Sequence, residues 1–154
     1  MKVEWINPFI RAANHVLGEM VAFEHSQLGR IEMEEKPYTT EEVTAMLGVS
    51  GVLSGSVLLG MTKKVAERIV ERMVGETTPI EDLLGESALG EVVNMISGSA
   101  LRFLESAGYS CNITPPVVIR GKGAIISTME RQRLVVPIQF PDAVFQLSVA
   151  LRQA

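Results

Sequence analysis

The sequence has few of the residues that build disulfide-linked or metal-bound scaffolds. Its 154 residues include one cysteine, Cys111, and two histidines, His15 and His25. A single cysteine forms no disulfide framework and no cysteine metal site within one chain. The two histidines are ten residues apart in the sequence, which is not a metal-ligand spacing. We therefore expect no disulfide-stapled domain and no metal ion bound by this chain.

Positive charge and aromatic residues are also scarce. Fourteen Lys and Arg stand against 18 Asp and Glu, so the formal net charge is −4. A nucleic-acid-binding protein needs a basic stripe to meet the phosphates, and we therefore expect no nucleic-acid partner. Aromatic residues make up only 5% of the chain, but hydrophobic residues make up 47%. That apolar content excludes a disordered chain and is enough for one domain with a buried core.

Long hydrophobic runs are missing as well. The run from Leu47 to Thr62 is broken by glycines and serines, and it is shorter than the roughly 20 apolar residues that span a bilayer. The segment from Met1 to Ile10 contains Glu4 and Pro8 and lacks the charged start and apolar core of a signal peptide. We expect a soluble cytoplasmic protein with no membrane partner.

Hydrophobic spacing predicts two long helices. The first covers about residues 7–24, with Asn7 as the N-cap and a proline in the first turn. The second is predicted to start at a capping box, Thr78-Pro79-Ile80-Glu81, and to run to about Ala107, where Gly108 ends it. A short extra helix is expected near residues 62–74, between the two.

Alternating apolar residues predict that the rest of the chain forms strands. Two hairpins are expected, at about residues 43–61 and 134–152, with turns at Ser50-Gly51 and Pro141-Asp142. Further strands are predicted at about residues 28–36, 111–120 and 124–130, the last pairing back on the one before it. Pro137 has no N–H group to donate to a ladder, so its strand is predicted to be an edge strand or to pair on one side only.

The chain resembles itself weakly. When residues 11–23 are set against residues 91–103, three pairs are identical: Asn14 with Asn94, Gly18 with Gly98 and Phe23 with Phe103. Each long helix is also followed by a hairpin, at an offset of about 90 residues. We interpret this as one domain over residues 1–154 with two degenerate helix–hairpin halves, about 5–75 and 78–154, related by a pseudo-twofold axis. Coincidence among common residues is the alternative.

The repeat draws attention to Glu91, because the first copy has Arg11 at that position. Glu91 and Asn94 are three residues apart and therefore neighbours on a helix surface. A helical wheel places them about 100° and about 160° from the predicted core face. That face comprises Leu84, Ala88, Val92, Ile96, Ser99, Phe103 and Ala107.

Small residues surround the pair, namely Ser87, Gly90, Ser97 and Gly98. Glycine within a helix costs about 1 kcal/mol relative to alanine, and close approach by a partner is one reason to accept that cost. Packing against another part of the same chain is the alternative for the glycines. For Glu91 and Asn94 the alternative is an ordinary solvated helix face.

The chemistry open to this pair is limited. An asparagine amide can hold a water molecule by accepting one hydrogen bond and donating another, but it is not a general base. Such a pair suits the positioning of water for hydrolysis of an activated substrate such as an acyl phosphate, where positioning and electrostatics supply most of the catalysis.

Three segments resemble one family. Ala88 to Gly98 resembles the E-x-x-N helix of the CheC/CheX/FliY family of chemotaxis phosphatases, and Asn112 to Val118 resembles the ITPP strand that follows that helix. The hairpin from Gly51 to Met61 is also similar. CheC-type relatives carry a motif on both long helices, whereas Arg11 replaces the first acid here, so the chain is most similar to the CheX branch.

The resemblance implies an α+β fold, with two long helices packed on one face of a mostly antiparallel sheet. It implies hydrolysis of the phospho-aspartate on a CheY-like response regulator. Glu91 would pair with the regulator's active-site lysine, and Asn94 would orient the attacking water. Mg²⁺ would be held by the regulator, and this chain would bind no cofactor. It also implies a homodimer, for which we expect the contact at the Pro137 edge.

Two other readings stay open at this point. The same helix face could serve a non-catalytic adaptor that sequesters a receiver domain or another signalling partner, because the degenerate first copy indicates that the fold tolerates loss of a motif. The second alternative is a small-molecule-binding α/β domain in which Gly90 and Gly98 pack internally. The sequence has no P-loop, no G-x-G-x-x-G opening a helix and no G-x-S-x-G elbow to support it.

Overall fold

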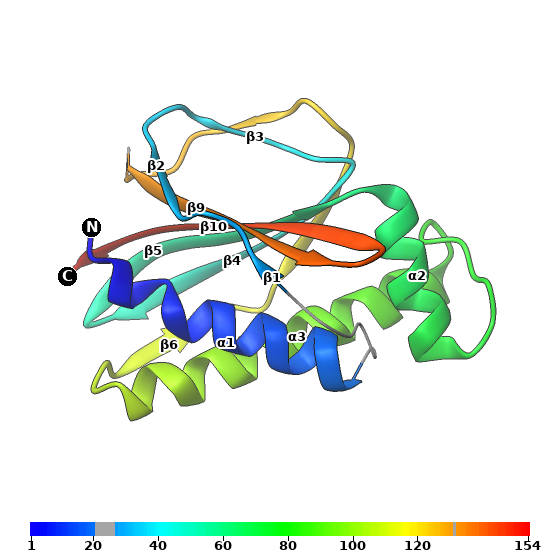
Figure 1. Ribbon diagram of the computed structural model, residues 1–154, viewed down its shortest axis with the longest axis horizontal. Coiled ribbons are helices and arrows are strands. Elements are labelled where there is room, and N and C mark those ends of the chain that lie inside the picture. Colours follow the sequence, from blue (N-terminus) through cyan, green and yellow to red (C-terminus); the bar gives the residue numbers. More distant parts are fainter. Residues whose placement is uncertain (21–26, 131) are drawn as a thin grey trace.

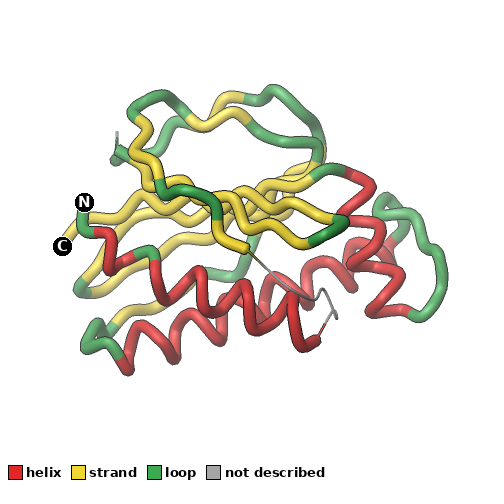
Figure 2. Tube along the Cα trace, viewed as in Figure 1, coloured by secondary structure: helices red, strands yellow, loops and turns green. Residues whose placement is uncertain are grey.

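Two helices cover one face of an antiparallel sheet. The computed structural model of the protein describes residues 1–20, 27–130 and 132–154. Helices α1 (Asn7–His15) and α3 (Leu83–Ser106) lie side by side and antiparallel across one face of an eight-stranded sheet, and α2 (Lys63–Val74) lies at one end (Figures 1 and 2). The predicted fold class, α+β with two helices on one face of a mostly antiparallel sheet and a short extra helix, is confirmed.

The two predicted hairpins form the middle of the sheet. The strand order is β1-β9-β10-β5-β4-β6, with β2 also paired to β9 and β7 also paired to β4, while β3 and β8 pair with each other. The strands are β1 (Gln27–Leu28), β2 (Glu32–Glu34), β3 (Tyr38–Thr39), β4 (Val43–Gly51), β5 (Leu53–Met61), β6 (Cys111–Ile113), β7 (Val117–Arg120), β8 (Ile125–Ile126), β9 (Arg133–Phe140) and β10 (Ala143–Gln153). The central pairing of β5 with β10 places Val57 opposite Val149 and Leu59 opposite Leu147.

The two halves of the chain interlock through the outer strands. β1 and β2 follow the first helix but pair with β9 of the second half. β6 and β7 follow α3 but pair with β4 of the first half. Neither half therefore completes its own part of the sheet. The internal duplication stays a prediction that this arrangement supports.

The core lies between the helices and the sheet. The largest side chains buried there come from both helices and from alternating strand positions: Phe9, Leu17, Leu53, Leu89, Leu104, Ile138, Phe145 and Leu151. Phe140 and Phe145 meet edge to face across the last turn, with ring centroids 5.8 Å apart. Because both hairpins contribute to this layer, one core holds both halves together.

Both long helices start differently from the prediction. The capping box at Thr78 is wrong, because the N–H of Asp82 bonds to the carbonyl of Pro79 at 3.2 Å and closes a turn before the helix begins at Leu83. The Thr78 hydroxyl donates to the carbonyl of Glu76 instead. Asn7 is likewise the first helical residue and not the cap, which is Ile6.

The first predicted helix also changes character along its length. Residues Val16–Met20 form a π-helical turn, η2, directly after α1. Residues 21–24 of the prediction lie outside the described residues. A short 3-10 turn, η1 (Val3–Trp5), precedes α1 and was not predicted.

The predicted start of α2 at Thr62 and the predicted ends of α2 and α3 at glycines are confirmed. The Thr62 hydroxyl accepts the N–H of Val65 at 3.2 Å and caps α2, which Gly75 ends with φ +92°. Gly108 has φ +91°, and the N–H of Tyr109 bonds back to the carbonyl of Leu104 at the end of α3. A left-handed residue after the last helical turn is the usual helix stop, and glycine adopts it without strain.

The prediction that the strand of Pro137 is an edge strand, or pairs on one side only, is wrong. β9 lies between β10 on one side and β1 and β2 on the other. Proline lacks a donor but keeps its carbonyl, and that carbonyl accepts the N–H of Gly29 at 2.8 Å, between β1 and β2. The predicted pairing of residues 124–130 with 111–120 is also wrong, since β8 pairs with β3.

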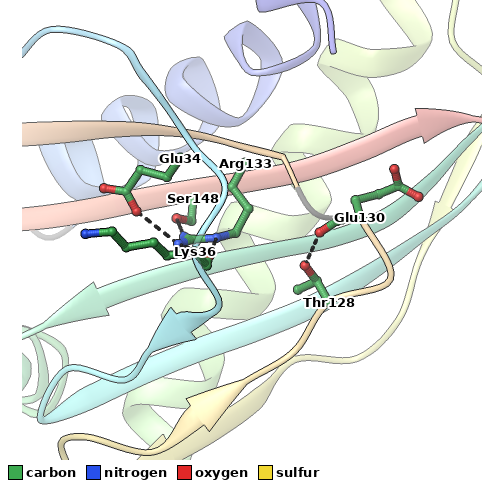
Figure 3. Close-up of polar contacts among 6 residues, drawn as sticks. All are labelled: Glu34, Lys36, Thr128, Glu130, Arg133 and Ser148. Carbon is green, nitrogen blue, oxygen red and sulfur yellow. Dashed lines mark hydrogen bonds and ion pairs between the residues drawn. The ribbon is translucent and has the colours of Figure 1, made fainter.

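A buried arginine ties a loop onto the second face of the sheet. β3 and β8 lie on the side away from the helices (Figure 1), and Arg133 on β9 is only 3% exposed. Its guanidinium donates to the Ser148 hydroxyl at 2.8 Å, to the Lys36 carbonyl at 3.0 Å and to the Glu34 carboxylate at 3.0 Å (Figure 3). No pattern in the sequence predicts this arginine, because its partners are distant along the chain.

We predict that Arg133→Met destabilises the protein by about 2–4 kcal/mol, because it leaves the Lys36 carbonyl and the buried Ser148 hydroxyl without their donor. Urea denaturation followed by circular dichroism measures the change. Arg120→Met is the matched control: Arg120 forms a surface ion pair with Glu86 at 3.0 Å, and its loss is expected to cost less than about 1 kcal/mol. Equal losses in the two variants would contradict the role given to Arg133.

Candidate functional site

Glu91 and Asn94 project from α3 on the side opposite the core. Both side chains are exposed. At 100° per residue, they point about 160° and about 140° from the mean direction of the buried residues. Those residues are Gly85, Leu89, Val92, Val93, Ile96, Ser97, Ser99, Ala100 and Leu104. Within the described part of the chain, the side chains of Glu91 and Asn94 form no hydrogen bond or ion pair.

The buried face of α3 is rotated by about 60° from the predicted one. Leu84 is 54% exposed and Ala107 is exposed, so both are wrongly placed in the predicted core. The reason is that α3 packs against α1 as well as the sheet: Val93 and Ala100 line the same apolar pocket as Phe9. This second contact draws that side of the helix into the core. It turns Glu91 outward, from about 100° to about 160° from the buried face, and leaves Asn94 on the outward side at about 140°.

The rotation also removes one predicted site residue. Ser97 is 8% exposed, and its hydroxyl donates to the carbonyl of Val93 at 2.9 Å. It is therefore not part of the accessible face, contrary to the prediction. Ser87 and Gly98 are exposed and Gly90 is half-buried, so these three remain beside the pair.

The three glycines of α3 have different surroundings. A Cβ atom at Gly85 would lie 2.1 Å from the carbonyl oxygen of Pro79, so this position excludes a side chain. A Cβ atom at Gly90 or Gly98 would meet nothing within 4 Å among the described residues. The alternative in which both glycines pack internally therefore has no support there. Gly90 and Gly98 lie one turn before and one turn after Asn94, which leaves the amide flanked by bare backbone.

The first helix does not carry a comparable pair. The Arg11 guanidinium stacks on the Phe103 ring, 4.1 Å from its centroid. Asn14 is half-buried, and its Oδ1 atom is buried with no hydrogen-bond partner in the described structure. A shallow groove beside Gly98 runs between the two helices, lined also by His15, Val16, Met95, Ser99 and Arg102.

Other residues named from the sequence lie away from the pair or have contacts of their own. The Thr114 of the ITPP segment is tied to β4: its N–H donates to the Gly48 carbonyl at 2.9 Å, and its hydroxyl accepts the Gly48 N–H at 2.8 Å. Cys111 is buried, and His15 lies 3.5 Å from the Glu19 carboxylate. His25 lies outside the described residues.

Two features near the start of α3 were not predicted. Lys63 bonds to Glu81 at 2.8 Å, and this hydrogen bond lowers the pKa of the Glu81 carboxyl and raises that of the lysine. Leu83, in the first turn, is 80% exposed. On the helical wheel Leu83 points about 180° from the predicted core face, so its exposure agrees with the spacing, whereas the exposure of Leu84, which is on that predicted face, does not.

The described residues contain no cluster of three or more His, Cys, Asp or Glu side chains arranged to hold a metal ion. None of the helices in the described part of the chain is long and apolar enough to cross a membrane.

Comparison with known proteins identifies the family. The sequence model described as "Chemotaxis phosphatase CheX" matches residues 43–139, which is more than half of the chain. The chain belongs to the CheX family. The predicted membership of the CheC/CheX/FliY group, in its CheX branch, is thereby confirmed.

Individual relatives agree with this assignment. The CheY-P phosphatase CheX of Thermotoga maritima is 28% identical over 120 residues, which cover 73% of this chain and 77% of the relative. A crystal structure of the chemotaxis protein CheX from Desulfovibrio desulfuricans superimposes with a TM-score of 0.84 at 27% identity, covering 99% of this chain and 100% of that one. The CheX of a CheX-CheY-BeF3-Mg²⁺ complex from Borrelia burgdorferi superimposes with a TM-score of 0.73 at 25% identity, covering 99% and 100%.

We predict opposite effects for alanine at two glycines of α3. Gly98→Ala should stabilise the fold by up to about 1 kcal/mol, because alanine favours the helix and the new methyl group meets open space. Gly85→Ala should destabilise it by about 1–3 kcal/mol, because the methyl group would press on the Pro79 carbonyl. Thermal and urea unfolding measure both changes. A loss of stability in Gly98→Ala would show that this position is packed after all.

Proposed function

We propose that this CheX-family protein hydrolyses the phospho-aspartate of a CheY-like response regulator and that Glu91 and Asn94 are the residues that act on it. The observation that carries the proposal is the placement of these two side chains. They are exposed, have no partner among the described residues, and lie three residues apart on the helix face that points away from the core. The names of the Thermotoga and Borrelia relatives, a CheY-P phosphatase and a complex with CheY, support the choice of substrate.

Asn94 would orient the attacking water. Its amide can accept a hydrogen bond from the water and donate another to a phosphoryl oxygen, which holds the water in line with the bond to be broken. The water oxygen bonds to phosphorus while the bond between phosphorus and the aspartate oxygen breaks, and the aspartate leaves as a carboxylate. The protons of the water end on the phosphate that is released. No general base on this chain is required, because the acyl phosphate is already activated.

Glu91 would anchor the partner. A carboxylate one turn from Asn94 can pair with the lysine of a receiver active site and fix where the amide enters. Mg²⁺ would be bound by the regulator, where it neutralises charge on the phosphoryl group. The bare backbone at Gly90 and Gly98 would let the regulator's loops reach Asn94 without a clash.

We also propose that the protein forms a homodimer, as the family resemblance implies. The Pro137 strand is internal. It therefore has no open edge for the dimer contact that the sequence analysis expected there. The outer strands of the sheet are β1 and β2 at one side and β6 and β7 at the other. Leu28, Met33 and Val117 on these strands are about half exposed, at 49%, 45% and 53%, and open edges with apolar side chains favour pairing with another chain.

We predict that Asn94→Ala lowers kcat for phosphate release by about 100-fold, since a water that is no longer oriented attacks far less often. The measurement follows inorganic phosphate from the phosphorylated regulator of the same organism in the presence of Mg²⁺. Affinity for the beryllofluoride form of the regulator should be retained. Asn14→Ala is the matched control, because Asn14 aligns with Asn94 but lies on the other helix, and it should keep wild-type kcat. Unchanged kcat in Asn94→Ala would refute the role of the amide.

For Glu91→Gln we predict a loss of about tenfold in kcat/KM, because the ion pair to the partner's lysine is removed while the size of the side chain is kept. Glu76→Gln, an exposed acid on the loop after α2, is the control and should behave as wild type. If the wild-type protein binds the regulator but leaves its dephosphorylation rate unchanged, the non-catalytic adaptor is the correct function.

A further inference from the structure

The first turn of α3 exposes two leucines that the fold does not use. Leu83 is 80% exposed and Leu84 is 54% exposed, although both follow directly on the helix N-cap, Asp82. The neighbouring Ile80 and Gly85 are buried, and Gly85 lies against the backbone of Pro79 and Ile80. Leu83 and Leu84 thus leave apolar surface in water without a packing role that would explain it.

These leucines lie on the same side of the helix as the candidate catalytic pair. At 100° per residue, Leu83 points within about 20° of Asn94, and Leu84 points within about 20° of Glu91. Between the two pairs the surface is small, since Ser87 is exposed and Gly90 has no side chain. The outward side of α3 therefore presents two apolar side chains at its start and two polar ones further along.

Their separation fits one interface. With a rise of about 1.5 Å per residue, Leu84 is about 10 Å from Glu91 along the helix axis, and Leu83 is about 16 Å from Asn94. A standard protein interface covers about 800 Å² on each partner, which is a disc of about 16 Å radius. Because 16 Å is the radius of that disc and not its full width, an interface that includes Asn94 and extends toward the start of α3 is large enough to cover both leucines.

We propose that Leu83 and Leu84 are an apolar docking contact for that receiver domain, a few turns away from the site of hydrolysis. The inference rests on the proposed function. It adds that Leu83 and Leu84 contribute to the affinity for the receiver, whereas Glu91 and Asn94 act in the hydrolysis. The occupant would be an apolar patch on the receiver beside its active-site loops. A polar pair that must reach a charged, Mg²⁺-bound phosphoryl group gains little net affinity from its own desolvation. Burial of two leucines supplies affinity without affecting the chemistry.

The test is a double variant, Leu83→Ser with Leu84→Ser. Titration against the regulator bound to beryllofluoride and Mg²⁺ should give a Kd raised by about tenfold or more. Phosphate release should show KM raised to a similar extent with kcat unchanged. Ile125→Ser is the matched control, because Ile125 is 72% exposed on β8, which lies on the far side of the sheet from α3 (Figure 1). It should leave both constants unchanged, and the melting temperature of each variant reports whether it folds.

Three results would overturn the inference. One is an unchanged Kd and KM in the folded double variant. Another is a fall in kcat at constant KM, which would place the leucines in the catalytic step. The third is a dimer that dissociates in the double variant, as seen by light scattering, because a second copy would then be the occupant. In each case the Asn94→Ala variant tests the proposed function separately. If that variant loses kcat, the phosphatase assignment stands and only the docking contact is wrong.

Discussion

The packing of α3 against both the sheet and α1 is the contact on which the rest of the structure depends. Val92 and Ile96 bury one side of the helix, and Val93 and Ala100 extend that burial toward α1. Burial of this width leaves one side of the helix exposed, and that side carries Glu91 and Asn94. The orientation of the pair is thus a consequence of where the apolar residues of the same helix find their partners.

This arrangement separates stability from function along one helix. Gly85 has no side chain because the turn at Pro79 lies against it, whereas Gly90 and Gly98 face open space. A glycine of the first kind serves the fold. Glycines of the second kind weaken the helix, and an approaching partner gives a reason for them. The same distinction applies to the leucines: Leu89 is buried in the core, while Leu83 and Leu84 are exposed.

The sheet joins the two hairpins into one core. The hairpins β4–β5 and β9–β10 meet at the centre, and each receives its outer strands from the other half of the chain. Neither half could bury its own hairpin edges without the other. The Arg133 network closes the opposite face by tying the segment from Glu34 to Lys36 onto β9 and β10.

The sequence by itself determined the local features: the end of α3 at Gly108, both boundaries of α2, the two hairpins, and the pair at Glu91 and Asn94 with its family resemblance. These depend on neighbouring residues, whose caps, turns and periodicity act over a few positions. Tertiary structure decided the rest. It moved the start of α3 past Thr78, placed Pro137 inside the sheet, buried Ser97 and Arg133, and left Leu84 in solvent. Each of these depends on which distant segment packs against the residue, and a local pattern of apolar and polar residues carries no information on that choice.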